Sequence, residues 1–351
     1  MRDPARTPDT TRLNPRPHGR AQDKTQDDTQ PARTQEPHAP EIHTRLRIAT
    51  YNIHKGVSAM SRKNRIHDLR AGLHALEADV VFLQEVQGRS DLHAERFHNW
   101  PDVAQHTFLA GDRWAEAVYG RNSVRSDGDH GNALLSRFPL VAHENIDISD
   151  HRFESRGLLH CEFDVGGRRV HCICAHLGLF EGSRVRQADV LIARIRSHVP
   201  PDAPLIIAGD FNDWRHRLGR RLVESLGVSE VFELRRERRR AAALRTLVAP
   251  GFVRRYGMRL GGQMETRIGT SLQSPVMAAF IARARAARMA IRAPRIAAPA
   301  RTFPSGFPLL RLDRVYVRGF TVASAAVLSG ARWRRLSDHA PIVAELDLTA
   351  P

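Results

Sequence analysis

The segment Gly209-Asp210-Phe211-Asn212 carries two side chains well suited to chemistry. An apolar run, residues 205–208, precedes it, which is typical of a buried strand that ends in a glycine turn. Asp210 and Asn212 are two residues apart, so both side chains point the same way if the extended geometry continues. The carboxylate can accept a proton or hold a metal ion, and the carboxamide can orient a water molecule or a phosphate oxygen. An Asp-Asn turn that only caps a strand has the same residues.

Other apolar runs are followed by polar side chains of the same kind. Glu85 comes shortly after the apolar run 80–83, where we expect the strand to end; a metal ligand explains a carboxylate there, and an exposed loop residue is the alternative. Asn52 closes an alternating strand that begins near Leu46. His176 ends a further strand, where a lone histidine is as often structural as functional.

Two more acidic residues and a histidine lie in the C-terminal part of the chain. Asp313 stands among the apolar residues of an expected strand over 309–317, where an unpaired charge is costly, and Asp338-His339 precedes an apolar strand. Because neighbouring side chains on a strand point apart, we expect Asp313, and not Asp338, to orient the His339 ring.

The expected strands alternate with amphipathic helices over 65–77, over 184–198 with Ser183 as its cap, and over 218–226. A sheet collects its strand ends at one rim, so the polar side chains should meet there. The complete set is Asn52, Glu85, His176, Asp210, Asn212, Asp313, Asp338 and His339.

The residue types of this set limit the chemistry. Glu85 and Asp338 offer hard oxygen ligands, which suit Mg²⁺ or Mn²⁺. Cys172, Cys174 and His176 share a strand face but are spaced too widely to converge on one ion, so we expect the two cysteines to be core residues. The chain has no zinc-protease motif, no phosphate-binding P-loop and no nucleophile elbow. What is left is metal-assisted attack of water on a phosphoester.

The order of six motifs resembles the endonuclease/exonuclease/phosphatase family, also called DNase I-like. The match runs from about residue 46 to residue 348, and the residue sequences of its motifs are similar to those of a small bacterial branch of the family. The motifs are Thr50-Tyr51-Asn52-Ile53-His54, Gln84-Glu85, Gly131-Asn132-Ala133-Leu134-Leu135-Ser136-Arg137, Ala175-His176-Leu177, Gly209-Asp210-Phe211-Asn212 and Ser337-Asp338-His339-Ala340-Pro341. The resemblance implies an α/β fold of four layers, in which two mixed sheets pack face to face between helices.

The resemblance also implies roles for the metal and phosphate ligands. Glu85 would bind the divalent metal, Mg²⁺ or Mn²⁺, with Asn52 beside it. Asp338 would be a metal ligand or an acid just behind the ligands. Lys55 and Arg156 would add phosphate contacts.

The remaining implied roles concern the reaction itself. Asp210 would position or deprotonate the attacking water, and Asn212 would orient the water or the phosphate. His176 and His339 would hydrogen-bond the scissile phosphate, with Asp313 orienting His339. A protonated His339 would stabilise developing negative charge.

Length and composition favour one large domain, residues 45–350, behind a disordered tail. The chain has 351 residues and is 42% hydrophobic, and its three cysteines form no disulfide framework. Residues 1–44 have almost no apolar side chains, so we expect them to be disordered. Neither a secretory signal nor a membrane-spanning run is present, which favours a cytoplasmic monomer.

The charge is concentrated in one expected insertion, residues 237–300. The net charge is +16, and residues 235–301 hold sixteen arginines against two glutamates, an excess of fourteen. Residues 275–292 fit an amphipathic helix with an arginine face. Such a helix suits a nucleic-acid backbone or an anionic membrane, or it docks on the core with a solvated face.

Three functions therefore stay open. The first is a Mg²⁺-dependent phosphodiesterase or nuclease that acts on nucleic acid, which the basic insertion favours. The second is a phosphatase or a phospholipid or sphingolipid phosphodiesterase at an anionic membrane surface. The third is a binding module without activity, against which the full set of polar strand ends argues.

Overall fold

The computed structural model describes residues 45–58, 63–152, 154–235, 237 and 300–350. These residues belong to one compact unit. The expected tail, residues 1–44, and all but the two end residues of the expected insertion, residues 237–300, lie outside the described residues. The expected domain limits therefore stay a prediction.

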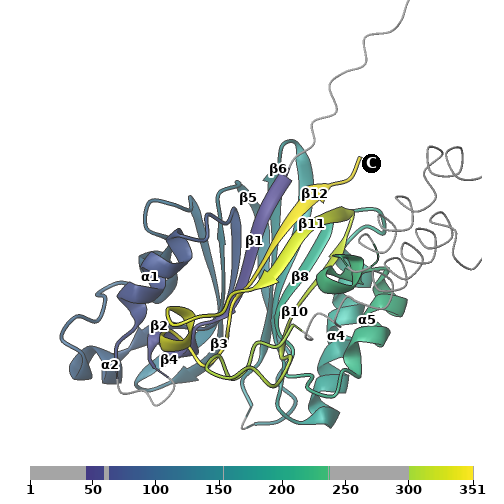
Figure 1. Ribbon diagram of the computed structural model, residues 1–351. Coiled ribbons are helices and arrows are strands. Elements are labelled where there is room, and N and C mark those ends of the chain that lie inside the picture. The colour runs from purple at the N-terminus through teal and green to yellow at the C-terminus, as the bar shows by residue number, and fades with distance from the viewer. Residues whose placement is uncertain (1–44, 59–62, 153, 236, 238–299, 351) are drawn as a thin grey trace, which may run out of the picture. The chain divides into compact units, whose positions relative to one another are not determined.

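Two six-stranded sheets form the centre of this unit (Figure 1). In spatial order, the first sheet contains β11 (Phe320–Val327), β12 (Ile342–Leu348), β1 (Arg45–Asn52), β2 (Val80–Ser90), β4 (Gly128–Ser136) and β3 (Glu116–Arg125). The second contains β5 (Leu140–Asp147), β6 (Gly157–Val165), β7 (Arg168–His176), β8 (Leu205–Asp210), β10 (Asp313–Arg318) and β9 (Ser229–Glu230). Both sheets are mixed, because β1 pairs with β2, and β7 with β8, in parallel, while the other neighbours are antiparallel.

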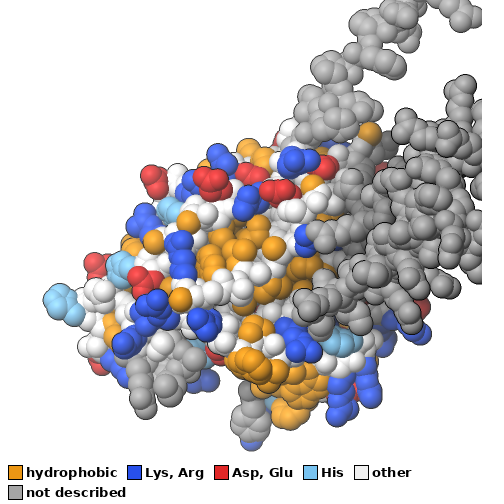
Figure 2. All heavy atoms as spheres, viewed as in Figure 1, with side chains coloured by type: hydrophobic (Ala, Val, Ile, Leu, Met, Phe, Trp, Pro, Cys, Tyr) orange, Lys and Arg blue, Asp and Glu red, His pale blue; other side chains and the backbone are white. Residues whose placement is uncertain are grey.

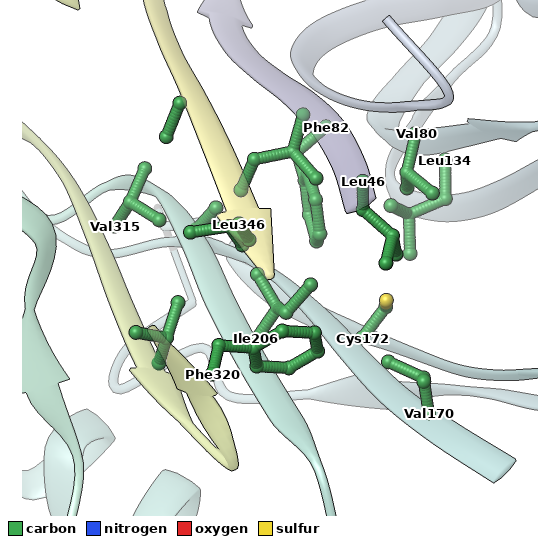
Figure 3. Packing of buried hydrophobic residues seen from close by; sticks show 14 of the residues in the cluster. Leu46, Val80, Phe82, Leu134, Val170, Cys172, Ile206, Val315, Phe320 and Leu346 are labelled. Atoms are coloured by element: carbon green, nitrogen blue, oxygen red, sulfur yellow. The ribbon is translucent and has the colours of Figure 1, made fainter. Parts of the chain in front are cut away.

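The inner faces of the two sheets make one hydrophobic core. Alternate residues of the central strands point into it, among them Phe82 of β2 and Ile206 of β8 (Figure 3). All three cysteines are buried in this layer, which confirms the prediction that Cys172 and Cys174 are core residues. Removal of this apolar surface from water is the main force that holds the sheets together.

Helices cover the outer face of each sheet. α1 (Ile66–His74) and α3 (Gln105–Ala110) pack on the first sheet, and α4 (Glu181–His198) and α5 (Leu218–Leu226) on the second. A short helix, α2 (Asp91–Arg96), follows β2. Figure 1 shows α1 on one side, the sheets between, and α4 and α5 on the other. The expected four-layer α/β sandwich is therefore confirmed.

Two local predictions were wrong. Helix α4 begins at Glu181, so Ser183 lies inside the helix and donates its hydroxyl to the Asp150 carboxylate instead of capping. β10 begins at Asp313, whereas an earlier start near Leu309 was expected. None of the helices in the described part of the chain has the length and apolar character needed to cross a membrane.

Candidate active site

Asp210 lies between two other predicted site residues at the rim of the second sheet. In the register of the strands, Asp210 pairs with His176 of β7 on one side and with Asp313 of β10 on the other. This close approach depends on Gly209, whose φ is 148°. A Cβ at that position would lie 1.9 Å from the carbonyl oxygen of Ala175.

His339 joins this group from the turn that leads into β12 of the first sheet. Its Nδ1 lies 2.8 Å from Asp313 Oδ2, and its Nε2 lies 3.7 Å from Asp210 Oδ2. All three side chains are buried. The expected pairing of His339 with Asp313 is thus present, while the neighbouring Asp338 points elsewhere.

Burial and neighbouring charges shift the pKa values of this group apart. Burial acts to lower the pKa of His339, but Asp313 and Asp210 outweigh it and raise that pKa to about 10. Burial raises the pKa of Asp210 to about 6, although His339 opposes the shift. Burial, and then the charge of Arg156, hold the pKa of His176 well below its usual value. At neutral pH, His339 is therefore a cation and His176 is neutral.

Glu85 reaches the site by a route that the sequence did not reveal. The expectation that its strand ends there was wrong, because β2 continues to Ser90. The pairing of β2 with β4 instead shifts register between Leu83 and Val86, and Glu85 has a φ of 56°. Such a bulge redirects a side chain without ending the strand, and bulges are frequent next to active sites.

Asn52 connects the two sheets at the site. Its Nδ2 donates to Glu85 Oε1 and to Asp210 Oδ2, each at 3.2 Å. Its Oδ1 accepts the backbone N–H of His54 at 3.1 Å. A single amide side chain thus fixes the distance between the carboxylate of the first sheet and that of the second.

The residues predicted to hold a divalent metal fit such an ion. The Nδ1 atom of His54 lies 3.4 Å from Asp338 Oδ1 and 4.0 Å from Glu85 Oε2, so both carboxylates approach the same imidazole. Burial acts to raise the pKa of Glu85, but His54, Lys55 and the Asn52 hydrogen bond outweigh it and lower that pKa. An ionised, oxygen-only donor pair of this kind suits Mg²⁺ or Mn²⁺.

The donor atoms of Asp210, Asp313 and His339 also lie within 4.8 Å of one another. A metal ion bound to His339 would have to displace the ring proton that Asp313 and Asp210 stabilise. We therefore interpret this second group as an acid–base set, separate from the pair Glu85 and Asp338.

Backbone strain is concentrated at the site. Among the described residues, those other than glycine with positive φ are His54, Lys55, Glu77, Glu85, Asn212 and His216. Four of these six border the site. Such conformations cost free energy and persist where the surrounding structure over-determines them, which is frequent in functional sites.

Lys55 and Arg156, the expected phosphate ligands, line one cavity of about 220 Å³, and the charge of Lys55 also lowers the pKa of Glu85. Arg125 and His130 also line the cavity, and sequence reasoning missed both. His54 was missed as well, although it stands in the motif that contains Asn52. A polar residue in a hairpin carries no periodic signal, so no pattern singled out Arg125 or His130.

A comparison with known protein families agrees with the fold and the candidate site described above. The model of the "Endonuclease/Exonuclease/phosphatase family" matches residues 49–339. The chain belongs to this family. Members of the endonuclease/exonuclease/phosphatase family are hydrolases that act on phosphoesters and typically use divalent metals.

Individual relatives of the chain support the same assignment. The "Uncharacterized protein YbhP" of Escherichia coli K12 is 34% identical over 305 residues, which cover 86% of this chain and 96% of that protein. A family member from Beutenbergia cavernae is similar in structure, with a TM-score of 0.55, 18% identity, and coverage of 87% of this chain and 72% of that one. One from Bacteroides vulgatus has a TM-score of 0.54, 14% identity, and coverage of 87% and 99%. These two structures show a shared fold.

Proposed function

We propose that this protein is a Mg²⁺- or Mn²⁺-dependent phosphodiesterase that cleaves nucleic acid with an activated water molecule. The observation that carries the proposal is the buried cation of His339 between Asp313 and Asp210, next to the carboxylate of Glu85. An acid, a base and a pair of metal-binding carboxylates at one rim are the parts that phosphodiester hydrolysis requires.

Asp210 is the base in this proposal. Its raised pKa, about 6, leaves it ionised at neutral pH and still basic enough to take a proton from water. The backbone N–H of Asn212 donates to Asp210 Oδ1 at 2.9 Å, and the Asn212 amide is fixed by a hydrogen bond to the carbonyl of Leu177. Both contacts hold the carboxylate and the amide in place before substrate arrives.

The two histidines act on the phosphate in different ways. His339 carries a fixed positive charge that stabilises the negative charge which develops on the phosphate oxygens. Asp313 holds the ring through Nδ1, so Nε2 is the donor directed at the site. His176, being neutral, contributes a hydrogen bond and no charge.

Glu85 and Asp338 would hold the divalent metal, and Asn52 would fix Glu85 beside Asp210. When bound, the metal would supply Lewis-acid stabilisation of the phosphate charge. The remaining chemistry in this proposal comes from the side chains described above.

Charge favours nucleic acid as the substrate. The described residues place Lys55, Arg125 and Arg156 around one cavity next to the site. The chain as a whole has a net charge of +16, and its main excess lies in residues 235–301. A surface of this sign attracts the phosphate backbone.

A phosphodiesterase or phosphatase that works at a membrane surface is the second candidate. Large apolar side chains are exposed on the loops that border the site: Leu179, Phe180, Trp214, Phe307 and Leu309. Figure 2 shows hydrophobic side chains gathered at the lower edge of the molecule, with Lys, Arg and His side chains beside them. Apolar loops flanked by cations also suit the surface of an anionic bilayer.

Hydrolysis by the purified full-length protein tests the proposal. The panel contains supercoiled plasmid, an abasic duplex, single-stranded RNA and short-chain phospholipids, each with Mg²⁺ or Mn²⁺. D210N and H339A should lose activity by at least about a hundredfold. D202N and H143A, which change exposed residues outside the candidate site, should keep full activity.

The substrate that is cleaved decides between the candidates. Cleavage of nucleic acid by the wild type, but not by D210N, supports the nuclease. Turnover of phospholipid alone would favour the membrane enzyme. Metal binding without turnover of any substrate would contradict both and favour a module that only binds.

A further inference from the structure

The cavity beside the carboxylates lies between the two halves of the site. It is lined from the first sheet by residues of the β3–β4 hairpin and from the second sheet by the loops before β6 and after β7. The charge of Lys55 lowers the pKa of Glu85, and that of Arg156 lowers the pKa of His176, so the cavity borders both halves. Its volume of about 220 Å³ is below the ~300–1,000 Å³ of pockets for whole small-molecule ligands. It therefore fits one unit of a longer substrate.

Three cations line this cavity without an acidic partner among the described residues. The side chains of Lys55 and Arg125 make no ion pair there. Among the described residues, the guanidinium of Arg156 hydrogen-bonds only to the carbonyl of Ser155, at 3.5 Å, and its Nε is buried without a partner. Arg121, on the same strand as Arg125, by contrast pairs with Asp129. Unpaired cations around one cavity are suited to binding an anion.

The acidic residue in the lining does not neutralise these cations. Oε2 of Glu154 accepts hydrogen bonds from Gln187, at 2.7 Å, and from the backbone N–H of Asp150, at 3.2 Å. His130 adds no charge at neutral pH, because burial, and then Lys55, lower its pKa to about 4. The cavity thus holds three positive charges against one carboxylate.

An aromatic wall completes the cavity. Phe180 has 67% of its surface exposed, and its ring centre lies 6.3 Å from that of His151, which also lines the cavity. Proteins that bind single-stranded nucleic acid combine an exposed aromatic ring with a neighbouring basic cavity. The cations bind the phosphate, and the base stacks on the ring.

We propose that this cavity binds the nucleotide next to the scissile phosphodiester, with Lys55, Arg125 and Arg156 on its phosphate and Phe180 against its base. The inference rests on the proposed function and narrows the substrate to single-stranded polynucleotide. Arg125 thus contacts a second phosphate and Phe180 contacts a base, apart from the group that is cleaved.

Binding of dinucleotides without metal tests this inference independently of catalysis. The ligands are two thymidines joined by one phosphodiester, without a terminal phosphate, with one at the 5′ end, and with one at the 3′ end. Titration calorimetry with full-length protein, in chelator and at low salt, gives the three affinities. We expect one of the two terminal phosphates to raise affinity about tenfold, as charge-assisted hydrogen bonds of this kind do.

Variants separate the phosphate contact from the ring contact. R125Q should reduce the gain from the terminal phosphate to about threefold or less. F180A should weaken all three dinucleotides by about tenfold and leave that gain intact. R121Q, on the same strand, and V190A, an exposed apolar side chain of α4 outside the cavity lining, are matched controls and should change neither quantity.

Each outcome decides one claim. Equal affinity of the wild type for the three dinucleotides, or an unchanged gain in R125Q, overturns the inference. Binding of phosphatidylglycerol vesicles that depends on Arg125, without dinucleotide binding, assigns the cavity to a lipid headgroup and also overturns it. Terminal-phosphate discrimination without hydrolysis in Mg²⁺ would leave the inference standing and contradict the proposed activity.

Discussion

The Nδ1 atom of His339 lies 2.8 Å from the Oδ2 atom of Asp313, and both side chains are buried. His339 comes from the turn before β12 of the first sheet, whereas Asp313 begins β10 of the second. The contact therefore crosses between the sheets and stabilises the charged form of the imidazole. The raised pKa of His339 is the chemical result of that placement.

The pH dependence of hydrolysis should be bell-shaped. Asp210 must be ionised to act as a base, so activity should be lost as pH falls through about 6. His339 must be protonated to stabilise negative charge, so activity should also be lost as pH rises through about 10. A profile of kcat/KM against pH with saturating metal checks both limbs, and a rate that does not change between pH 8 and pH 11 would rule out the charged role of His339.

D313N gives a sharper test of the same pair. Asp313 raises the pKa of His339, so its replacement should move the alkaline limb of the profile to lower pH. The acidic limb should stay in place or move slightly to lower pH. A uniform loss of rate, with both limbs unmoved, would show that Asp313 acts only through structure.

D210N should stabilise the protein although it abolishes activity. The pKa of Asp210 is higher in the folded state than its ordinary value of 3.8, so the folded state binds its proton more tightly. Stability is then lost as pH rises from about 4 to about 6, and the full cost is present at pH 7. We expect D210N to raise the free energy of unfolding at pH 7 by about 1–3 kcal/mol in metal-free buffer. Urea unfolding measures it, with the exposed-site variant D202N as the unchanged control; a less stable D210N would contradict the argument.

E85Q should remove the effect of metal on thermal stability. An ion that binds only the folded state raises Tm by mass action, and Glu85 is the ionised carboxylate best placed to hold it. Millimolar Mn²⁺ should therefore raise the Tm of the wild type and of E224Q, whose carboxylate is exposed on α5, but not that of E85Q. If E85Q responds as the wild type does, the metal site lies elsewhere.

Asn132 should matter for stability more than for catalysis. It is fully buried in β4, and its Nδ2 donates to the carbonyls of Gly157, at 2.8 Å, and Cys174, at 3.3 Å, which belong to the other sheet. N132A removes both hydrogen bonds between the sheets, so we expect a loss of about 2–4 kcal/mol in urea unfolding. Asn145 makes one exposed bond to the Arg121 carbonyl, and N145A should cost less than about 1 kcal/mol. Equal losses in both variants would mean that the buried hydrogen bonds of Asn132 stabilise the fold no more than the exposed one of Asn145.

The layers of the fold were predicted from the resemblance to the family, whereas the polar strand ends were predicted from short-range patterns in the sequence. Alternating apolar runs that end in polar residues identify central strands, and strand ends meet at a rim. The pairing of Asp313 with His339 followed from the rule that adjacent side chains on a strand diverge, which excluded Asp338.

Other features depend on geometry that residue types do not encode. The bulge at Glu85 is invisible in the sequence, because an apolar run followed by a carboxylate looks the same whether the strand ends or bends. The location of His54 between Glu85 and Asp338 depends on the positive φ of its own backbone. Arg125 and Phe180 meet at one cavity only because the two sheets bring distant loops together.

The hydrogen bonds from Asn52 to Glu85 and Asp210 have a consequence for how activity fails. In the proposed mechanism the first sheet supplies the carboxylate for the metal and the second supplies the base, so both sheets are needed for hydrolysis. A small displacement of one sheet against the other would separate the two carboxylates without unfolding either sheet. We therefore expect heat or mild denaturant to abolish the proposed hydrolysis while the secondary structure is still intact.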